Sequence, residues 1–175
     1  MTERVDIAEM PAWIKKLEGR LHEAALRGLL AAALRTKAHI ITSVIPQEPR
    51  VPVDRGIYRA GWQVQKLNNG AYIYNPTPHA SIIEDGARAE NIKIGAAMIQ
   101  ALIAWVKRKG LTTSKKGTSA WAGEAESIAW AIAKNMQKNG IFNKGHGLGI
   151  MRKARTAIPR FITEEVTREL KRIGK

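Results

Sequence analysis

Residues 11–45, "PAWIKKLEGRLHEAALRGLLAAALRTKAHIITSVI", carry a long helical pattern. Apolar side chains recur there at three- and four-residue steps, while charged side chains fall mostly on other faces. The apolar positions are Ile14, Leu17, Leu21, Ala25, Leu29 and Ala32. Pro11 suits the first turn, because the N–H that proline lacks has no partner there in any helix. The pattern predicts a single helix over residues 11–45.

The length of this helix has a consequence for packing. At 1.5 Å per residue it would be about 50 Å long. The chain has 175 residues, which suits a single domain spanning residues 1–175. A domain of that size would not cover such a helix along its whole length. We therefore expect the helix to pack partly on neighbouring subunits.

The segment after the helix predicts a β-hairpin. Three prolines in "PQEPRVPVDRG" (residues 46–56) exclude helix there. Between residues 58 and 75 the pattern shifts to a two-residue alternation, with "NNG" as the turn between "GWQVQKL" and "AYIYN". The next stretch, "HASIIEDG", favours a helical turn that Gly86 ends.

The remaining chain predicts three more helices. Their approximate ranges are residues 95–109, 120–138 and 150–173. Ser119 suits the N-cap of the second helix and Gly140 its end. Pro159 should kink the third helix or begin a new one. The fold class predicted is α+β: a long N-terminal helix, a small antiparallel sheet with a hairpin, and three further helices.

The charge of the chain is high and uneven. The net charge is +14, and residues 107–175 hold 16 Lys and Arg against 5 Asp and Glu. Residues 1–106 hold 13 against 10. A basic half of this kind indicates an acidic partner, which charge alone does not identify among nucleic acid, an anionic membrane and an acidic protein face.

The composition also excludes several classes of protein. The chain has no cysteine, which excludes disulfides and thiolate metal sites. No apolar run approaches the roughly 20 residues that a membrane span needs. The N-terminus, "MTERVDIAEM", does not resemble a signal peptide. We expect no membrane association, and synthesis in a reducing cytoplasm.

The sequence gives little support for an enzyme. His79 with Glu84 and Asp85 invites a hypothesis of a metal site or a general base, but the spacing matches no zinc motif. A simpler interpretation is that Glu84 satisfies buried backbone groups or pairs with Arg55 or Arg59. "GHGLG" (residues 145–149) lacks the Lys-Ser/Thr of a phosphate loop and is predicted to be a turn. We therefore predict no catalytic residue, no metal and no cofactor. Four tryptophans are expected in the core: Trp62, Trp105, Trp121 and Trp130.

Two short motifs, taken together with the order of elements, carry a family resemblance. The first is "PVDRG-x2-RAGW" and the second "HA-x3-E-x-G". This arrangement resembles the head–tail joining and tail-completion (neck) proteins of long-tailed bacteriophages, over roughly residues 10–170. The matching residues are Pro52, Val53, Asp54, Gly56, Gly61 and Trp62 in the first motif, and Ala80, Glu84 and Gly86 in the second. Arg55 replaces the family's usual Thr, and His79 its usual Tyr.

The resemblance implies a non-enzymatic structural virion protein. It implies a homo-oligomeric ring in the phage neck, six-fold by family precedent, made in the host cytoplasm. Its partners would be head connector or adaptor proteins on one side and tail tube or tail terminator proteins on the other, with DNA in the lumen as a further contact. The motif residues would be scaffold corners: Asp54 and Gly56 form a tight turn, Trp62 anchors a strand, and Glu84 and Gly86 close the next corner.

Two other functions stay open at this stage. One is a basic DNA-binding protein without enzymatic activity, although the sequence shows no helix-turn-helix, zinc-finger or RNA-binding signature. The other is a metal-dependent hydrolase that uses His79 and Glu84.

The C-terminal helix predicts a docking surface. On an unbroken helix, Lys153, Arg160, Arg168, Lys171 and Lys175 fall near one face, with Arg172 at its edge. The apolar stripe of Ala154, Ile158, Ile162 and Val166 lies roughly opposite. This basic face is either a solvated surface or, in the functional interpretation, one through which Arg168, Lys171 and Arg172 dock onto an acidic ring or tube surface. Reversing their charge should impair head–tail joining and leave the fold intact.

Overall fold

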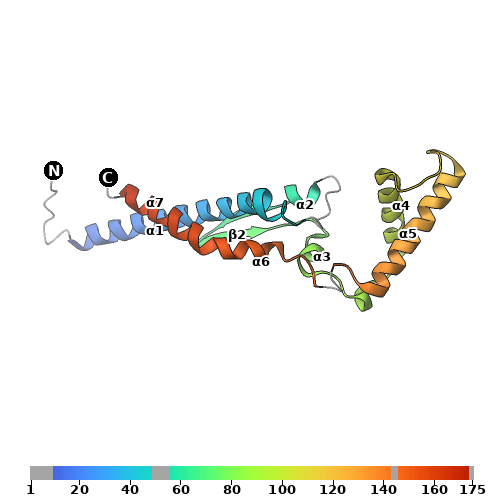
Figure 1. The fold of residues 1–175 in the computed structure, drawn as a ribbon. Helices are drawn as coiled ribbons and strands as arrows, with labels where there is room; N and C mark the ends of the chain where they lie inside the picture. The colour runs from blue at the N-terminus through green and yellow to red at the C-terminus, as the bar shows by residue number, and fades with distance from the viewer. Residues whose placement is uncertain (1–9, 49–55, 143–145, 174–175) are drawn as a thin grey trace. The chain divides into compact units, whose positions relative to one another are not determined.

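The computed structural model describes residues 10–48, 56–142 and 146–173. The chain forms two compact units (Figure 1). The first unit comprises Met1–Ala80 and Ile150–Lys175, and the second comprises Ser81–Gly149. The fold class is α+β, as predicted.

The first unit is built on the long helix. α1 spans Met10–His39 and continues as a π-helical segment over Ile40–Val44, so the helix predicted over residues 11–45 is confirmed. α7 (Ile158–Ile173) lies along α1 (Figure 1). The two helices are antiparallel, because Arg35 contacts Glu164 whereas Arg20 contacts the carbonyl of Ile173.

The closest approach of α1 and α7 is at a glycine. A Cβ atom added to Gly28 would lie 2.6 Å from Cα of Val166 and 2.9 Å from its backbone nitrogen. Real side chains do not approach a backbone this closely, so only glycine allows the two helices to meet here.

The predicted hairpin is confirmed. β1 (Gln63–Leu67) pairs antiparallel with β2 (Gly70–Tyr74), with Gln63 opposite Tyr74. Both strands pack against α1. One correction concerns the start of this region: residues 57–60 form a short helix, α2 (Ile57–Ala60), where strand was expected. The physical reason is Gly56, whose left-handed φ of 65° turns the chain into a helical turn.

The predicted C-terminal helix is interrupted. α6 (Ile150–Ala154) is followed by a 3-10 turn over Arg155–Ala157, and α7 begins at Ile158. Pro159 lies in the first turn of α7. Proline has no N–H for the carbonyl four residues earlier, and its ring clashes with that carbonyl. A new helix therefore begins at this point, one of the two outcomes predicted.

The second unit is dominated by a pair of helices. It contains α3 (Ala80–Asp85), a 3-10 turn over Ala89–Asn91, α4 (Ala96–Lys109) and α5 (Ser119–Asn139). α4 packs against α5, and three alanines form the fully buried stripe of α5: Ala125, Ala129 and Ala133. The N-cap of α5 is Thr118, whose Oγ1 accepts a hydrogen bond from the Trp121 N–H at 3.2 Å. The predicted cap, Ser119, is instead the first helical residue.

The tryptophans do not all lie in the core. Trp62 is 2% exposed, but Trp130 on α5 is 41% exposed. Trp105 and Trp121 are half-buried. The expectation is therefore wrong for Trp130. The reason is that the fully buried side of α5 is its alanine stripe, and Trp130 lies outside that stripe.

Candidate interaction surfaces

Part of the first motif lies in the structure. Pro52, Val53, Asp54 and Arg55 fall outside the described residues. Gly56 adopts the left-handed conformation that the predicted tight turn requires. Gly61 is closely packed, because a Cβ atom there would lie 2.6 Å from both Asn75 Oδ1 and Thr77 Cγ2.

Asn75 joins the two ends of this region. Its Nδ2 donates to the carbonyl of Tyr58 at 2.8 Å. Its Oδ1 accepts from the backbone N–H of Thr77 at 3.1 Å and from the Thr77 hydroxyl at 2.8 Å. In the predicted hairpin, Asn75 is only the last residue. The available signal was an asparagine before Pro-Thr-Pro, since its amide can bond nearby backbone on both sides.

Trp62 belongs to a small aromatic cluster in the first unit. Its ring meets that of Tyr58 edge-on, with centroids 5.8 Å apart and an interplanar angle of 76°. Both side chains are buried. The His79 ring lies 6.4 Å from the Tyr58 ring. His79 thus packs beside Tyr58 as an aromatic ring.

The second motif forms a corner at α3. Ala80 is buried, and Gly86 follows α3 with a φ of 77°. The carbonyl of Glu84 accepts from the Gly149 N–H at 3.0 Å. A Cβ atom on Gly147 would lie 2.1 Å from that same carbonyl oxygen. Residues 146–149 therefore turn tightly against the end of α3, and the turn predicted at 145–149 is confirmed for its described part.

The hydrolase hypothesis requires a set of metal-binding side chains, and the described residues do not provide one. Within residues 10–48, 56–142 and 146–173, no three His, Asp or Glu side chains gather where they could hold a metal ion. His79 faces Tyr58, and the Glu84 side chain is half-buried beside the corner described above.

α1 exposes an apolar stripe near its N-terminal end. Trp13 and Ile14 are each 45% exposed, and Leu21 is 42% exposed. Arg20 Nη2 donates to the carbonyl of Ile173 at 3.2 Å, so the described part of α7 ends opposite Arg20. Figure 1 shows α1 running on past that point. Ile14 and Leu21 precede Gly28 by multiples of seven residues, so the exposed stripe continues the face that packs against α7.

A second apolar surface lies between α1, β2 and the C-terminal helices. It is a groove of about 300 Å³. Its lining residues include Leu29, Ala32, Thr36, Ile73, Ile158 and Ile162. Beside it, the described sheet has only two strands, so each strand keeps one edge with unpaired backbone groups. Such an edge can accept a strand from another chain.

The cations of α7 are largely paired within the chain. Glu165 and Glu169 are buried, and they contact Arg35 at 3.1 Å and Arg27 at 3.2 Å respectively. Arg168 pairs with Glu165.

Two further contacts complete this network. Arg172 pairs with Glu169 at 2.5 Å. The hydrogen bond with Glu164, together with that to Glu165, raises the pKa of the Arg35 guanidinium above its ordinary value.

This network corrects the predicted faces of the C-terminal helix. The buried side chains of α7 are Phe161, Glu165 and Glu169, whereas Ile162 and Val166 are only half-buried. The reason is that Arg35 and Arg27 of α1 pair with the two glutamates, so the glutamates are on the side of α7 that faces α1. Two of the three predicted docking residues, Arg168 and Arg172, pair with Glu165 and Glu169 of their own helix, while Lys171 is exposed.

The loop between α4 and α5 is held by a carboxylate. Glu124 accepts hydrogen bonds at 2.9 Å from the backbone N–H of Thr113, the Thr113 hydroxyl and the backbone N–H of Ser114. These bonds, the one from the Thr113 backbone foremost, lower the pKa of Glu124 to about 2. Nearby, the Lys107 ammonium lies 4.7 Å from the centre of the Trp121 ring.

Comparison of the chain with protein-family models, curated proteins and solved structures finds no match. The likeness to phage neck proteins therefore depends on the motif residues and the order of elements. No helix among the described residues is long and apolar enough to cross a membrane.

Proposed function

We propose that this protein is a structural, non-enzymatic subunit of the neck of a long-tailed bacteriophage. It assembles into a ring between head connector or adaptor proteins and the tail tube or tail terminator proteins. The observation that carries the proposal is the exposed stripe of α1, because Trp13 and Ile14 continue a packed helical face past the described end of α7, and Leu21 begins that exposed stretch.

Burial on another subunit would stabilise this stripe. Fully burying a large apolar side chain contributes about 1.5–3 kcal/mol. The stripe lies on one patch of the first unit, and the groove between α1 and β2 lies on another. A contact that joins two different patches is heterologous, and such contacts close into rings when the rotation fits. These surfaces thus suit a ring subunit better than a two-fold dimer.

The motif residues support the assignment of this subunit to the phage neck. In the described chain, Gly56, Gly61 and Gly86 lie at turns or close contacts. Trp62 is buried, and the Glu84 backbone is bonded in a corner. These are scaffold roles, as the resemblance to neck proteins implies. The six-fold number, the neighbouring proteins and the place in the virion, after synthesis in the host cytoplasm, follow from that resemblance.

Electron microscopy of assembly tests the proposal. Negative-stain images of the purified protein, alone and mixed with tail tubes of the same phage, should show rings or capped tubes. The double variant Trp13→Ser/Ile14→Ser should lose rings and caps while its circular dichroism stays that of the wild type. Leu34→Ser is the matched control, because Leu34 is exposed on the same helix but lies outside the stripe.

Two results would count against the neck assignment. One is a protein that stays monomeric and leaves tail tubes uncapped. The other is a double variant that assembles like the wild type, which would remove the stripe from the interface. A monomer that shifts short duplexes tightly at physiological salt would favour the alternative, a basic DNA-binding protein without enzymatic activity.

A further inference from the structure

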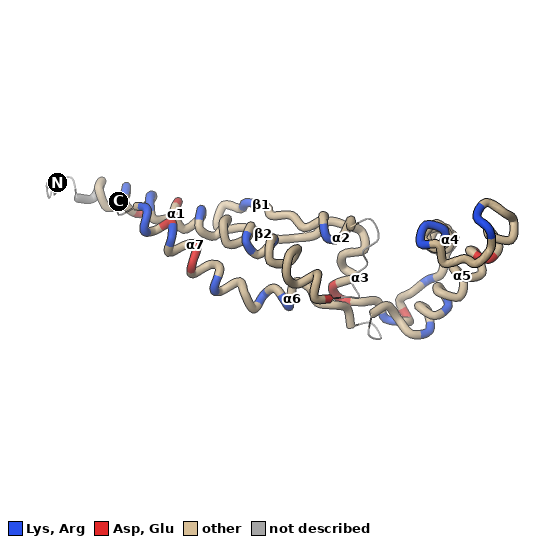
Figure 2. Tube along the Cα trace, turned by 45° about the horizontal axis from the view of Figure 1, so that its top comes forward, with Lys and Arg blue, Asp and Glu red and all other residues tan. Residues whose placement is uncertain are grey.

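Five cations gather at one end of the α4–α5 pair. They are Lys107, Arg108, Lys109, Lys115 and Lys116, which we call the basic tip. The first three form the last turn of α4, and the other two lie in the loop that leads to α5. Figure 2 shows these Lys and Arg positions at the end of α4 and in the adjoining loop.

The acid nearest in sequence to the tip, Glu124, is engaged by the loop between α4 and α5. Glu124 directs its carboxylate to backbone and hydroxyl groups of Thr113 and Ser114. Lys115 and Lys116 are exposed, and no described acid pairs with either of them. Lys107 lies over the Trp121 ring, which leaves its charge in place. By contrast, the cations of α7 face glutamates of their own chain.

We propose that the basic tip binds the phosphate backbone of duplex DNA without selecting a sequence. Beside the cations, Thr112 supplies a further hydroxyl group, whereas the hydroxyls of Thr113 and Thr118 already bond Glu124 and cap α5. Lysine, arginine and hydroxyl groups are the side chains that contact phosphates. The centre of a protein interface is instead depleted of lysine and enriched in aromatic residues. Leu111, 46% exposed, is the large apolar side chain exposed in this loop.

The inference rests on the proposed function, in which DNA passes through the lumen of the ring. One tip can neutralise few phosphates, so a single subunit binds weakly. Non-specific binding at physiological salt has dissociation constants of about 10⁻⁴–10⁻⁶ M. A ring presents several copies of the tip to the same duplex, and linked binding sites strengthen the overall affinity.

Salt-dependent DNA binding tests the tip. Fluorescence anisotropy of a labelled duplex of about 20 base pairs is followed from 50 to 200 mM KCl. A plot of the logarithm of the binding constant against the logarithm of the salt concentration gives a slope. The magnitude of this slope falls by about 0.9 for each phosphate that the protein no longer neutralises. The variant Lys115→Gln/Lys116→Gln should bind several-fold more weakly at 50 mM KCl, with a slope shallower by about 1–2.

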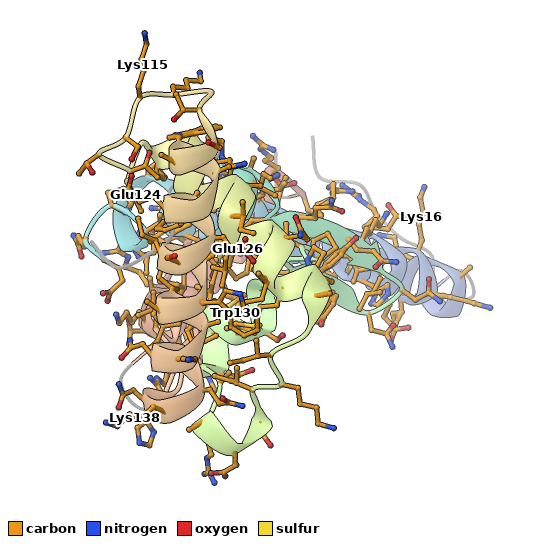
Figure 3. All side chains as sticks on the ribbon, turned by 90° about the vertical axis from the view of Figure 1, so that its right-hand side faces the viewer. Lys16, Lys115, Glu124, Glu126, Trp130 and Lys138 are labelled. Atoms are coloured by element: carbon orange, nitrogen blue, oxygen red, sulfur yellow. The ribbon has the colours of Figure 1, made fainter. Side chains whose placement is uncertain are left out.

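A charge-matched control separates the tip from net charge. Lys134→Gln/Lys138→Gln removes the same charge from α5, and Figure 3 shows Lys138 at the opposite end of that helix from Lys115. This control should keep the wild-type slope. Equally weakened binding in both variants, or wild-type binding by the tip variant, would overturn the proposal. So would displacement of the duplex by polyglutamate as effectively as by unlabelled duplex of equal charge, which would indicate an acidic protein partner.

The same variants keep this inference distinct from the neck assignment. The tip variant should form rings or capped tubes like the wild type. If the wild type forms rings but binds no duplex, the proposal for the tip is wrong and the neck assignment stands. Duplex binding through the tip by a protein that never assembles would support the tip and contradict the neck assignment.

Discussion

The two units of this protein stabilise their helices in different ways. The first unit buries large side chains such as Trp62 and Tyr58, and it pairs its cations with buried glutamates across α1 and α7. The second unit packs α4 on an alanine stripe of α5 and leaves cations at one end of the pair. The difference shows that cations close along the sequence can pair with glutamates of their own helix in one place and be exposed in a loop in another.

The largest expected effect tests the aromatic core of the first unit. Trp62→Ala should lower the free energy of unfolding by about 3–5 kcal/mol, because it leaves a cavity beside Tyr58. Trp130→Ala in the second unit is the control, since that side chain is 41% exposed, and it should cost less than about 1 kcal/mol. Urea denaturation measures both. Similar destabilisation of the two variants would break the contrast between the units.

The next effect concerns helix packing at glycine. Gly28→Ala should destabilise by about 1–3 kcal/mol, because the new methyl group meets the backbone of Val166. Gly123→Ala on α5 meets nothing within 4 Å, so it should stabilise by up to about 1 kcal/mol through helix propensity. Thermal unfolding followed by circular dichroism reports both signs. A neutral Gly28→Ala would show that α1 and α7 can move apart at no cost in stability.

Charge reversal on α7 should have a smaller effect. Arg168→Glu/Arg172→Glu places new carboxylates beside Glu165 and Glu169, and we expect a destabilisation of about 1–2 kcal/mol because the arginines are largely exposed. This replaces our sequence-based expectation that reversal would leave the fold intact. Lys171→Glu, at an exposed position, should change stability by less than about 0.5 kcal/mol.

Lys171→Glu also provides the cleaner test of docking by α7. Head–tail joining can be scored for this variant while its fold stays intact. If joining proceeds normally, the α7 surface has no docking role at Lys171. If the double variant is as stable as the wild type, the pairing of Arg168 and Arg172 does not stabilise the helix pair.

The smallest effect is a pH dependence in the second unit. The folded pKa of Glu124 is about 2, below its ordinary value of 4.5. A depressed carboxylate pKa contributes stability above the unfolded pKa, and that contribution is lost as the pH falls through the folded value. The melting temperature of the wild type should therefore exceed that of Glu124→Gln above pH 5. The gap should close between pH 4.5 and about 2, and a gap independent of pH would contradict the assigned hydrogen bonds.

Much of the local structure was predictable because its causes are local. Apolar periodicity indicated the helix over residues 11–45, and "NNG" indicated the hairpin turn. Gly86 and Gly140 follow helices with positive φ, as their positions in the sequence indicated. Pro159 marked the start of α7. The errors in local structure include α2, which begins after the left-handed Gly56, and the cap at Thr118, which lies next to the predicted Ser119.

The sequence by itself determined which segments are helix or strand, because hydrogen bonds within a helix or a short hairpin join residues close along the chain. Only the tertiary structure decided which charges pair and which stay exposed. Glu165 meets Arg35 across 130 residues of sequence, and Gly28 meets Val166 at a helix crossing that no periodicity specifies. A helical pattern fixes which residues share a face, but packing fixes what that face meets. For that reason only the tertiary structure shows that Arg168 and Arg172 pair with glutamates of α7, whereas Lys115 and Lys116 of the basic tip are exposed.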